Sequence, residues 1–378
     1  MVGLYNKYKS YILYLFMYAP LGFVCPLIGQ YCSSIGFNGT QVGLVTSVGT
    51  LGAVLGGLFW GKIFANAKNR RFVVCIMFLG AMLSGLISTR VFFYLTYAMM
   101  YGLIYFFMGP AHGLCDTMVI ENDENFPPIR AMGAIGYAVA CYFGGLYSET
   151  HGLVSIFYMF AIGYLLSSII VLTEIEPPHL KEKEEKINIS ELFKNKSYIK
   201  LLICSFFVIG TTMANNTYFS YLFKEAGGNL SGIGLSFLLM AGSEAVFMAL
   251  VPVFNRILKT EKLIIFGIIV AILRFGLYSF GPSTGVLLGT FFLQGAMNGI
   301  LLVEIVKYFE KIVEPRMASI SVSTYYSLGN YLSSIICNLI GGVILDIGGA
   351  KVVYLFMMAM NVAGLILYFI FGLHRTHN

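Results

Sequence analysis

The chain has 378 residues, of which 58% are hydrophobic and 11% charged, with a mean hydropathy of +0.80 and a formal net charge of +6. A soluble globular protein carries about 25% charged residues, so this composition excludes an ordinary soluble domain and indicates a membrane protein. The basic residues stand in short segments between apolar runs, which argues against a nucleic-acid partner. The seven cysteines are scattered singly in apolar segments, and we expect them to pack as small apolar side chains. We expect no metal and no cofactor.

Apolar runs long enough to cross a bilayer recur along the whole chain. A spanning helix needs about 20 residues, and the pattern predicts an all-α membrane protein with twelve transmembrane helices in two six-helix halves. The expected spans are 10–34, 40–65, 72–89, 91–117, 129–149, 152–173, 198–223, 231–255, 261–280, 284–307, 317–345 and 350–373.

The longest polar segment, 174-EIEPPHLKEKEEKINISELFKNKS-197, separates the sixth expected span from the seventh. It predicts an N-terminal six-helix half at 1–173, a cytoplasmic linker at 174–197 and a C-terminal half at 198–378. Such a duplication is typical of secondary transporters, whose site lies between the halves near the midplane.

The basic residues predict the orientation. If the N-terminus is cytoplasmic, all but five of the 24 lysines and arginines fall on cytoplasmic segments, in accordance with the positive-inside rule. The five exceptions are Arg90, Lys224 and Lys351 on the outer side, with Arg130 and Arg274 in or beside the spans. We therefore expect both termini to be cytoplasmic, in the plasma (inner) membrane of a bacterium.

Glycines are closely spaced at the end of the second expected span. Gly52, Gly56, Gly57 and Gly61 form two small-xxx-small pairs, which let helices approach closely in a membrane. The same stretch spells GxxxxGK, but Ile63 stands where a nucleotide-binding loop needs Ser or Thr. Helix packing is therefore the better explanation of these glycines.

Ionisable residues inside the spans are functional candidates, because embedding a charge costs about 2.5–3.5 kcal/mol on insertion scales. They are Asp116 with His112 on the fourth span, Arg130 at the start of the fifth, Glu244 on the eighth and Arg274 on the ninth. A rise of about 1.5 Å per residue places Glu244 and Arg274 at similar depth on adjacent helices, and Asp116 and Arg130 likewise. We expect two ion pairs. An alternative is that they only orient helices, although buried pairs stabilise poorly.

Three further polar residues have two explanations each. Asn215 and Asn216, in 211-TTMANNTY-218, interrupt the seventh span and bind either a hydroxylated ligand or another helix. Glu304 on the tenth span is followed three residues later by Lys307, and a surface helix pair is the simpler explanation of it.

Several stretches resemble the major facilitator superfamily, in the clade of lactose permease and the nucleoside:proton symporters. The segment 130-RAMGAIGYAVA-140 resembles the fifth-helix signature of lactose permease. The resemblance implies that Arg130 binds substrate and that Asp116 takes the place of its paired carboxylate. Tyr137 stands where the permease has a tryptophan that stacks on the sugar.

The second half carries the rest of the resemblance. The segment 243-SEAVFMAL-250 is similar to the eighth helix, with Glu244, and Arg274 matches the ninth-helix arginine of the proton-coupling group. The segment 301-LLVEIVKYFEKIVEPRMAS-319 aligns with the tenth helix, which puts Gln294 in the place of a histidine and Met297 in the place of the proton-carrying glutamate. The resemblance therefore implies coupling by Glu244, Arg274 and Gln294, with Asp116 as the second candidate proton carrier.

These features favour a secondary active transporter that works by alternating access. We expect it to move a small hydroxylated solute, a sugar or a nucleoside, together with a proton, and to act as a monomer in the lipid bilayer. A uniporter and a drug or metabolite efflux carrier are the alternatives within transport. A membrane receptor and a membrane-embedded enzyme are the alternatives outside it, but the sequence has no nucleophile–base or metal constellation of the kind an enzyme needs.

Overall fold

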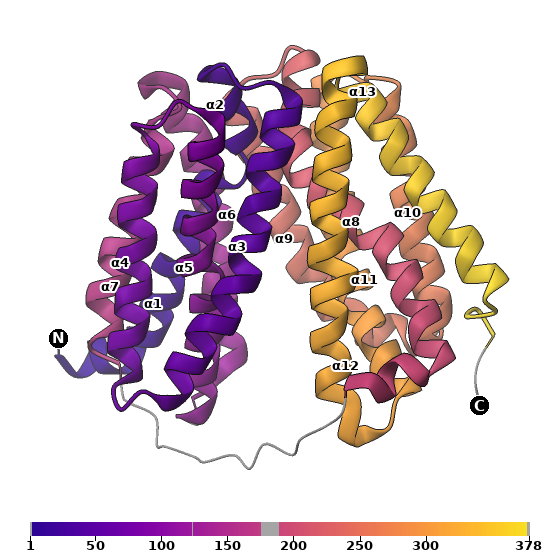
Figure 1. Ribbon diagram of the computed structural model, residues 1–378, viewed down its shortest axis with the longest axis horizontal. Helices are drawn as coiled ribbons and strands as arrows, with labels where there is room; N and C mark the ends of the chain where they lie inside the picture. The colour runs from indigo at the N-terminus through magenta and orange to yellow at the C-terminus, as the bar shows by residue number, and fades with distance from the viewer. Residues whose placement is uncertain (1, 123, 175–188, 376–378) are drawn as a thin grey trace. The chain divides into compact units, whose positions relative to one another are not determined.

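The computed structural model describes residues 2–122, 124–174 and 189–375, and this part of the chain is helical with no strand (Figure 1). The helices of the N-terminal half are α1 (Val2–Val24), α2 (Ile28–Ser34), α3 (Gly39–Asn66), α4 (Arg70–Ser88), α5 (Tyr94–Glu121), α6 (Phe126–His151) and α7 (Ser155–Val171). Those that follow are η1 (Ile189–Lys194), α8 (Lys196–Glu225), α9 (Leu230–Phe254), α10 (Thr260–Ser279), α11 (Thr284–Ile312), η2 (Pro315–Met317), α12 (Ala318–Thr324), the π-helical η3 (Tyr325–Leu332) and α13 (Ser333–Ile370).

The first compact unit contains α1 to α7 and also the segment Gly228–Ala241, which includes the beginning of α9. Within it α1 packs on α6 and α7, α3 on α5, and α4 on α5 and α7. The beginning of α9 is bound to the end of α6, since Glu149 accepts hydrogen bonds from the Asn229 side chain at 3.0 Å and the Ser231 main-chain nitrogen at 3.1 Å.

The second compact unit contains η1, α8, the rest of α9 from Gly242 onward, and α10 to α13. Here α8 packs on α13 and η3, and α10 packs on α11 and α13. The long helix α13 is interrupted at Gly349, whose φ of +73° suits glycine because it has no Cβ. The helix restarts with the Ala350 nitrogen donating to Glu225 Oε1 at 2.9 Å.

The predicted count of twelve spans is only partly reproduced. Nine described helices are long and apolar enough to cross a membrane, or ten if α1 and α2, bent by 43°, count as one span. The predicted first span at 10–34 is broken between α1 and α2. The break contains Pro26, which cannot donate a main-chain hydrogen bond. Helix α7 has only 17 residues and is not among the nine. The 51 residues of 320–370 are counted as a single one of the nine. Most of the predicted linker, 175–188, lies outside the described residues.

Of the four α3 glycines with small-xxx-small spacing, two make the close helix contact that the sequence predicts. A Cβ placed on Gly52 would collide with the main chain of Gly102, and one on Gly56 would collide with the main chain of Phe106, both in α5. Nothing lies within 4 Å of a Cβ on Gly57 or Gly61. Of these four glycines, Gly52 and Gly56 are therefore the pair that brings the α3 and α5 main chains together.

The adjacent glycines allow a matched test of this packing. We expect Gly56→Ala to destabilise the protein by about 1–3 kcal/mol, the usual cost of overpacking, because its methyl group would meet main-chain atoms. Gly57→Ala should be neutral or stabilising by up to about 1 kcal/mol, since alanine favours a helix over glycine. Thermal unfolding of the purified protein in detergent compares the two, and equal stabilities would contradict the packing account.

Candidate functional site

The first polar cluster lies on α1, α5 and α6, and we call it the first-half site. The Tyr14 hydroxyl donates to Asp116 Oδ1 at 2.6 Å, and the Arg130 guanidinium carbon lies 4.3 Å from the centre of the Tyr18 ring. The expected Asp116–Arg130 ion pair is wrong: within the described residues Arg130 has no carboxylate within 4.0 Å. Tyr14 satisfies the carboxylate instead, and the aromatic face stabilises the cation.

His112 belongs to the same site. Its ring stacks on Tyr18 with centroids 4.4 Å apart, and its Nε2 lies 3.0 Å from the Met17 carbonyl oxygen. Because a carbonyl oxygen can only accept, Nε2 carries the proton, and Nδ1 of the neutral ring remains an acceptor. Asp116, His112 and Arg130 are all half-buried, so the site presents acceptors and a guanidinium to a ligand.

Tyr137 lies about two helical turns from Arg130 along α6. It is half-buried, and its hydroxyl is within hydrogen-bonding reach of the thiols of Cys25 and Cys141. The structure thus puts Tyr137 on the same helix as Arg130 but in a different set of contacts, and Tyr18 is the aromatic ring that contacts the guanidinium.

The second polar cluster, the second-half site, is centred on Arg274 of α10, which is 2% exposed. Its guanidinium donates to Gln294 Oε1 and, at 3.1 Å, to Asn215 Oδ1. The same Asn215 oxygen accepts a hydrogen bond of 2.8 Å from the Tyr354 hydroxyl. The aromatic rings of Phe275, Tyr278 and Phe291 lie 4.8–5.3 Å from the guanidinium carbon.

Two amides connect Arg274 to Glu244. Since a guanidinium only donates, Gln294 turns its oxygen to Arg274 and its NH₂ group to Asn298 Oδ1 at 3.2 Å. Asn298 in turn donates from Nδ2 to Glu244 Oε2 at 3.4 Å. The expected direct Glu244–Arg274 pair is therefore wrong, and an ordered chain of amide dipoles takes its place.

Several buried polar atoms of the second-half site have no hydrogen-bond partner among the described residues. They are Nδ2 of Asn215, Oδ1 of Asn216 and Nε of Arg274. Leaving a buried polar group unsatisfied costs about 1–3 kcal/mol. A ligand or a water molecule that hydrogen-bonded to these atoms would remove that cost.

Glu304 has a different environment from the one expected. Its pair with Lys307 is present at 3.0 Å, but the carboxylate is fully buried and also accepts from Asn255 Nδ2 at 2.8 Å. Helix α9 ends one residue before Asn255, so the carboxylate joins the end of α9 to α11. It is part of the packing of the second unit and not a surface pair.

Sequence reasoning missed Tyr14, Tyr18, Asn298 and Tyr354. A usable signal existed for Asn298, which follows Gln294 by four residues and so lies on the same helix face. The tyrosines gave no such signal, because Tyr is common throughout this chain, with 25 copies.

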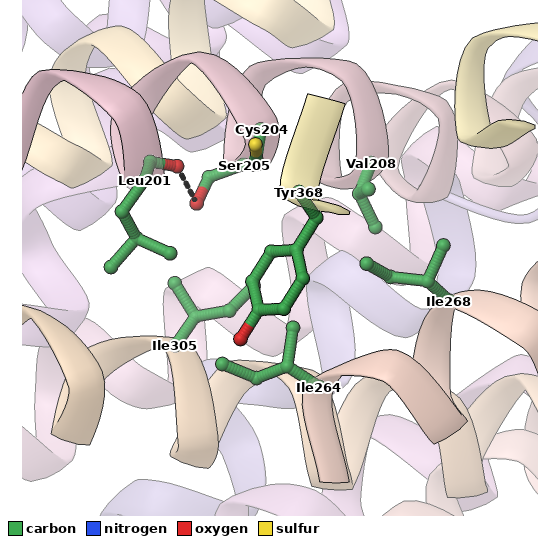
Figure 2. Close-up of a pocket in the computed structure, with 8 residues that line it drawn as sticks. All are labelled: Leu201, Cys204, Ser205, Val208, Ile264, Ile268, Ile305 and Tyr368. Atoms are coloured by element: carbon green, nitrogen blue, oxygen red, sulfur yellow. Dashed lines mark hydrogen bonds between the residues drawn. The ribbon is translucent and has the colours of Figure 1, made fainter. Parts of the chain in front are cut away.

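A small pocket in the second unit is not a polar site. Figure 2 shows it between α8, α10, α11 and α13, lined mainly by aliphatic side chains. Its Ser205 hydroxyl donates back to the Leu201 carbonyl oxygen at 2.8 Å, and the Tyr368 hydroxyl donates to the Glu261 carbonyl oxygen at 3.3 Å. With both hydroxyls already paired, the pocket is a packing gap.

Apolar helices of spanning length with an arginine site in each half are typical of an integral membrane transporter. The chain belongs to the MFS_1 like family, whose model matches residues 7–356. It is 26% identical to the transporter YwbF of Bacillus subtilis, over 93% of this chain and 90% of that protein. It is 25% identical to a maltose permease of Geobacillus stearothermophilus, over 94% and 92% of the two chains.

Solved structures confirm the fold. The crystal structure of the nucleoside transporter NupG superposes with a TM-score of 0.86 at 18% identity, covering 99% of this chain and 100% of that one. A D-xylose–proton symporter superposes with a TM-score of 0.72 at 13% identity, covering 96% of each. The family and these neighbours are transporters, so the chain is a secondary transporter of a small molecule and not an enzyme.

Proposed function

We propose that this protein is a symporter that carries a small hydroxylated solute, a sugar or a nucleoside, together with a proton. The observation that carries the proposal is the hydrogen-bonded chain from Arg274 through Gln294 and Asn298 to Glu244. It links a permanent charge to a group that can gain and lose a proton. Relatives named for maltose and nucleoside transport support the solute class.

The first-half site binds the solute in this proposal. Arg130 offers a planar fork of donors, Asp116 offers carboxylate oxygens and His112 offers Nδ1, which together match the donors and acceptors of vicinal hydroxyls. Tyr137 offers an aromatic face to a sugar ring or a base. For Asn215 and Asn216, solute binding stays a prediction, supported by the unpaired amide atoms Nδ2 of Asn215 and Oδ1 of Asn216.

Glu244 carries the coupling proton in this proposal. When ionised, it accepts from Asn298 and favours the orientation of both amides that places an oxygen on Arg274. When protonated, it is a weaker acceptor and can itself donate, so the hydrogen bonds on Arg274 and Asn215 weaken. Protonation of Glu244 thereby changes the atoms that Asn215 offers to the solute.

The chain crosses the membrane twelve times in this proposal, in halves at 1–173 and 198–378 with both termini cytoplasmic. To the nine long helices we add the bent pair α1 and α2 as one span and the short apolar α7 as another. The run of 51 residues at 320–370 would be roughly 75 Å long at 1.5 Å per residue. That is more than twice the hydrocarbon thickness, so it supplies two spans that meet at Gly349.

Cysteine labelling tests the orientation. On a background in which the seven native cysteines are replaced, Lys194→Cys should be protected from an impermeant maleimide applied to intact cells, and Lys224→Cys should react. Both lysines are exposed, so burial does not explain a difference. Labelling at 194 in intact cells, with permeabilised cells as the positive control, would overturn the orientation.

Counterflow in proteoliposomes tests the solute class. Vesicles preloaded with one unlabelled sugar or nucleoside are diluted into the labelled form, and we expect a transient overshoot for at least one member of the panel. Overshoot for apolar drugs but for no sugar or nucleoside would favour the efflux alternative.

A further inference from the structure

A third buried carboxylate lies outside both sites. Glu174 follows the end of α7 and is 4% exposed. Its Oε2 accepts from the Ser10 hydroxyl at 3.1 Å and lies 3.7 Å from the Lys9 ammonium nitrogen. Its Oε1 is buried with no hydrogen-bond partner among the described residues. One oxygen is therefore held by α1, and the other is free to bind a proton or water.

Glu174 also lines a small cavity. Glu174 lines it together with Leu13, Cys115, Met118, Val119 and Asn122. Leu13 and Cys115 directly precede Tyr14 and Asp116, the hydrogen-bonded pair of the first-half site. Two residues that line the cavity are thus the chain neighbours of that pair, one on α1 and one on α5, and Glu174 lines the same cavity.

The charges around Glu174 permit a change of protonation near neutral pH. Burial raises the pKa of its carboxyl group to about 7, the Lys9 ammonium opposes this rise and the Glu124 carboxylate adds to it. From α4, Arg71 donates to the main-chain oxygen of Glu174 at 2.7 Å. Below about pH 7 Glu174 is neutral, and above it the ion pair with Lys9 forms.

We propose that Glu174 is the group through which the first-half site exchanges a proton with the cytoplasm. The O–H bond of protonated Asp116 breaks, the proton crosses the cavity through water, and a new O–H bond forms at Glu174 Oε1. Asp116 is left ionised with its hydrogen bond from Tyr14, and Glu174 releases the proton on the cytoplasmic side. The inference rests on the proton coupling and the orientation proposed above, and it adds a route in the first half to the role of Glu244.

Infrared difference spectroscopy of the purified protein tests the group itself without a solute. We expect a protonated carboxyl band that disappears with a midpoint near pH 7 and is absent in Glu174→Gln. Lys9→Met should move the midpoint up, because a favourable cation is lost, and Glu124→Gln should move it down. A band that survives Glu174→Gln unchanged would overturn the inference.

Uptake tests the route. With the solute identified by counterflow, we expect Glu174→Gln to lower the initial rate of pH-gradient-driven uptake at least tenfold and Glu174→Asp to recover part of it. Glu304→Gln, which removes a buried carboxylate of the second unit, should stay within twofold of the wild type. Thermal unfolding in detergent checks that each variant is folded. If the wild type responds to the pH gradient and Glu174→Gln responds equally, only this inference fails. A wild type that ignores the gradient removes the proposed function and this inference together.

Discussion

Replacement of Arg130 by alanine is expected to abolish solute binding, with a rise in Kd of at least 100-fold. In the proposed site the guanidinium makes two hydrogen bonds to the solute, and each charge-assisted bond contributes about 1.5–3 kcal/mol. Two such bonds correspond to at least 3 kcal/mol, or more than a factor of 100 at 1.4 kcal/mol per tenfold change. Equilibrium binding by isothermal calorimetry or scintillation proximity measures the effect.

Two further variants test whether the loss of binding is specific to the Arg130 guanidinium. Arg130→Lys keeps the charge but not the planar fork, and we expect at least a tenfold loss. Arg90→Ala removes an exposed arginine far along the chain from both sites and should leave Kd unchanged. Wild-type affinity in Arg130→Ala would show that the solute binds elsewhere.

Replacement of Glu244 by glutamine is expected to separate exchange from accumulation. Glutamine resembles the protonated side chain and can still accept from Asn298, so solute exchange should persist. Accumulation driven by a pH gradient should fall to the equilibrium level, because no proton can be released from this position. Counterflow and uphill uptake, measured on the same vesicles, give the two quantities.

The neighbours of Glu244 sharpen this prediction. Asn298→Leu removes the amide that links Gln294 to Glu244. It should also reduce accumulation, although Glu244 is intact. Glu304→Gln removes a buried carboxylate on α11 whose partners are Asn255 and Lys307, and it should keep accumulating solute. If Glu244→Gln still concentrates solute, the first-half route through Asp116 is sufficient for coupling and Glu244 is not the coupling group.

Composition and hydropathy predicted the all-α membrane fold because burial in lipid requires long apolar helices whatever their neighbours are. The break at Pro26 was not predicted, and the expected separation of the spans 317–345 and 350–373 is reduced to the single non-helical residue Gly349. A helix end depends on local hydrogen bonding, and a window of apolar residues does not record it. The positions of Asp116, Arg130, Glu244 and Arg274 within their helices followed from spacing alone.

The partners of those charges could not be predicted in the same way. The helical rise determines how deep a residue lies in the membrane, but it does not determine which side chains of a neighbouring helix face that residue. Tyr14 thus takes the place of Arg130 beside Asp116, and the amides of Gln294 and Asn298 stand between Arg274 and Glu244. Roles in binding and coupling remain predictions for all of these residues.

Uphill transport in proteoliposomes tests the central claim most directly. Vesicles that are alkaline inside and acidic outside should accumulate the labelled sugar or nucleoside above its external concentration, and a protonophore should return it to equilibrium. Uptake that only equilibrates the solute, at the same rate with and without the pH gradient, would contradict proton symport and leave facilitated diffusion as the mechanism.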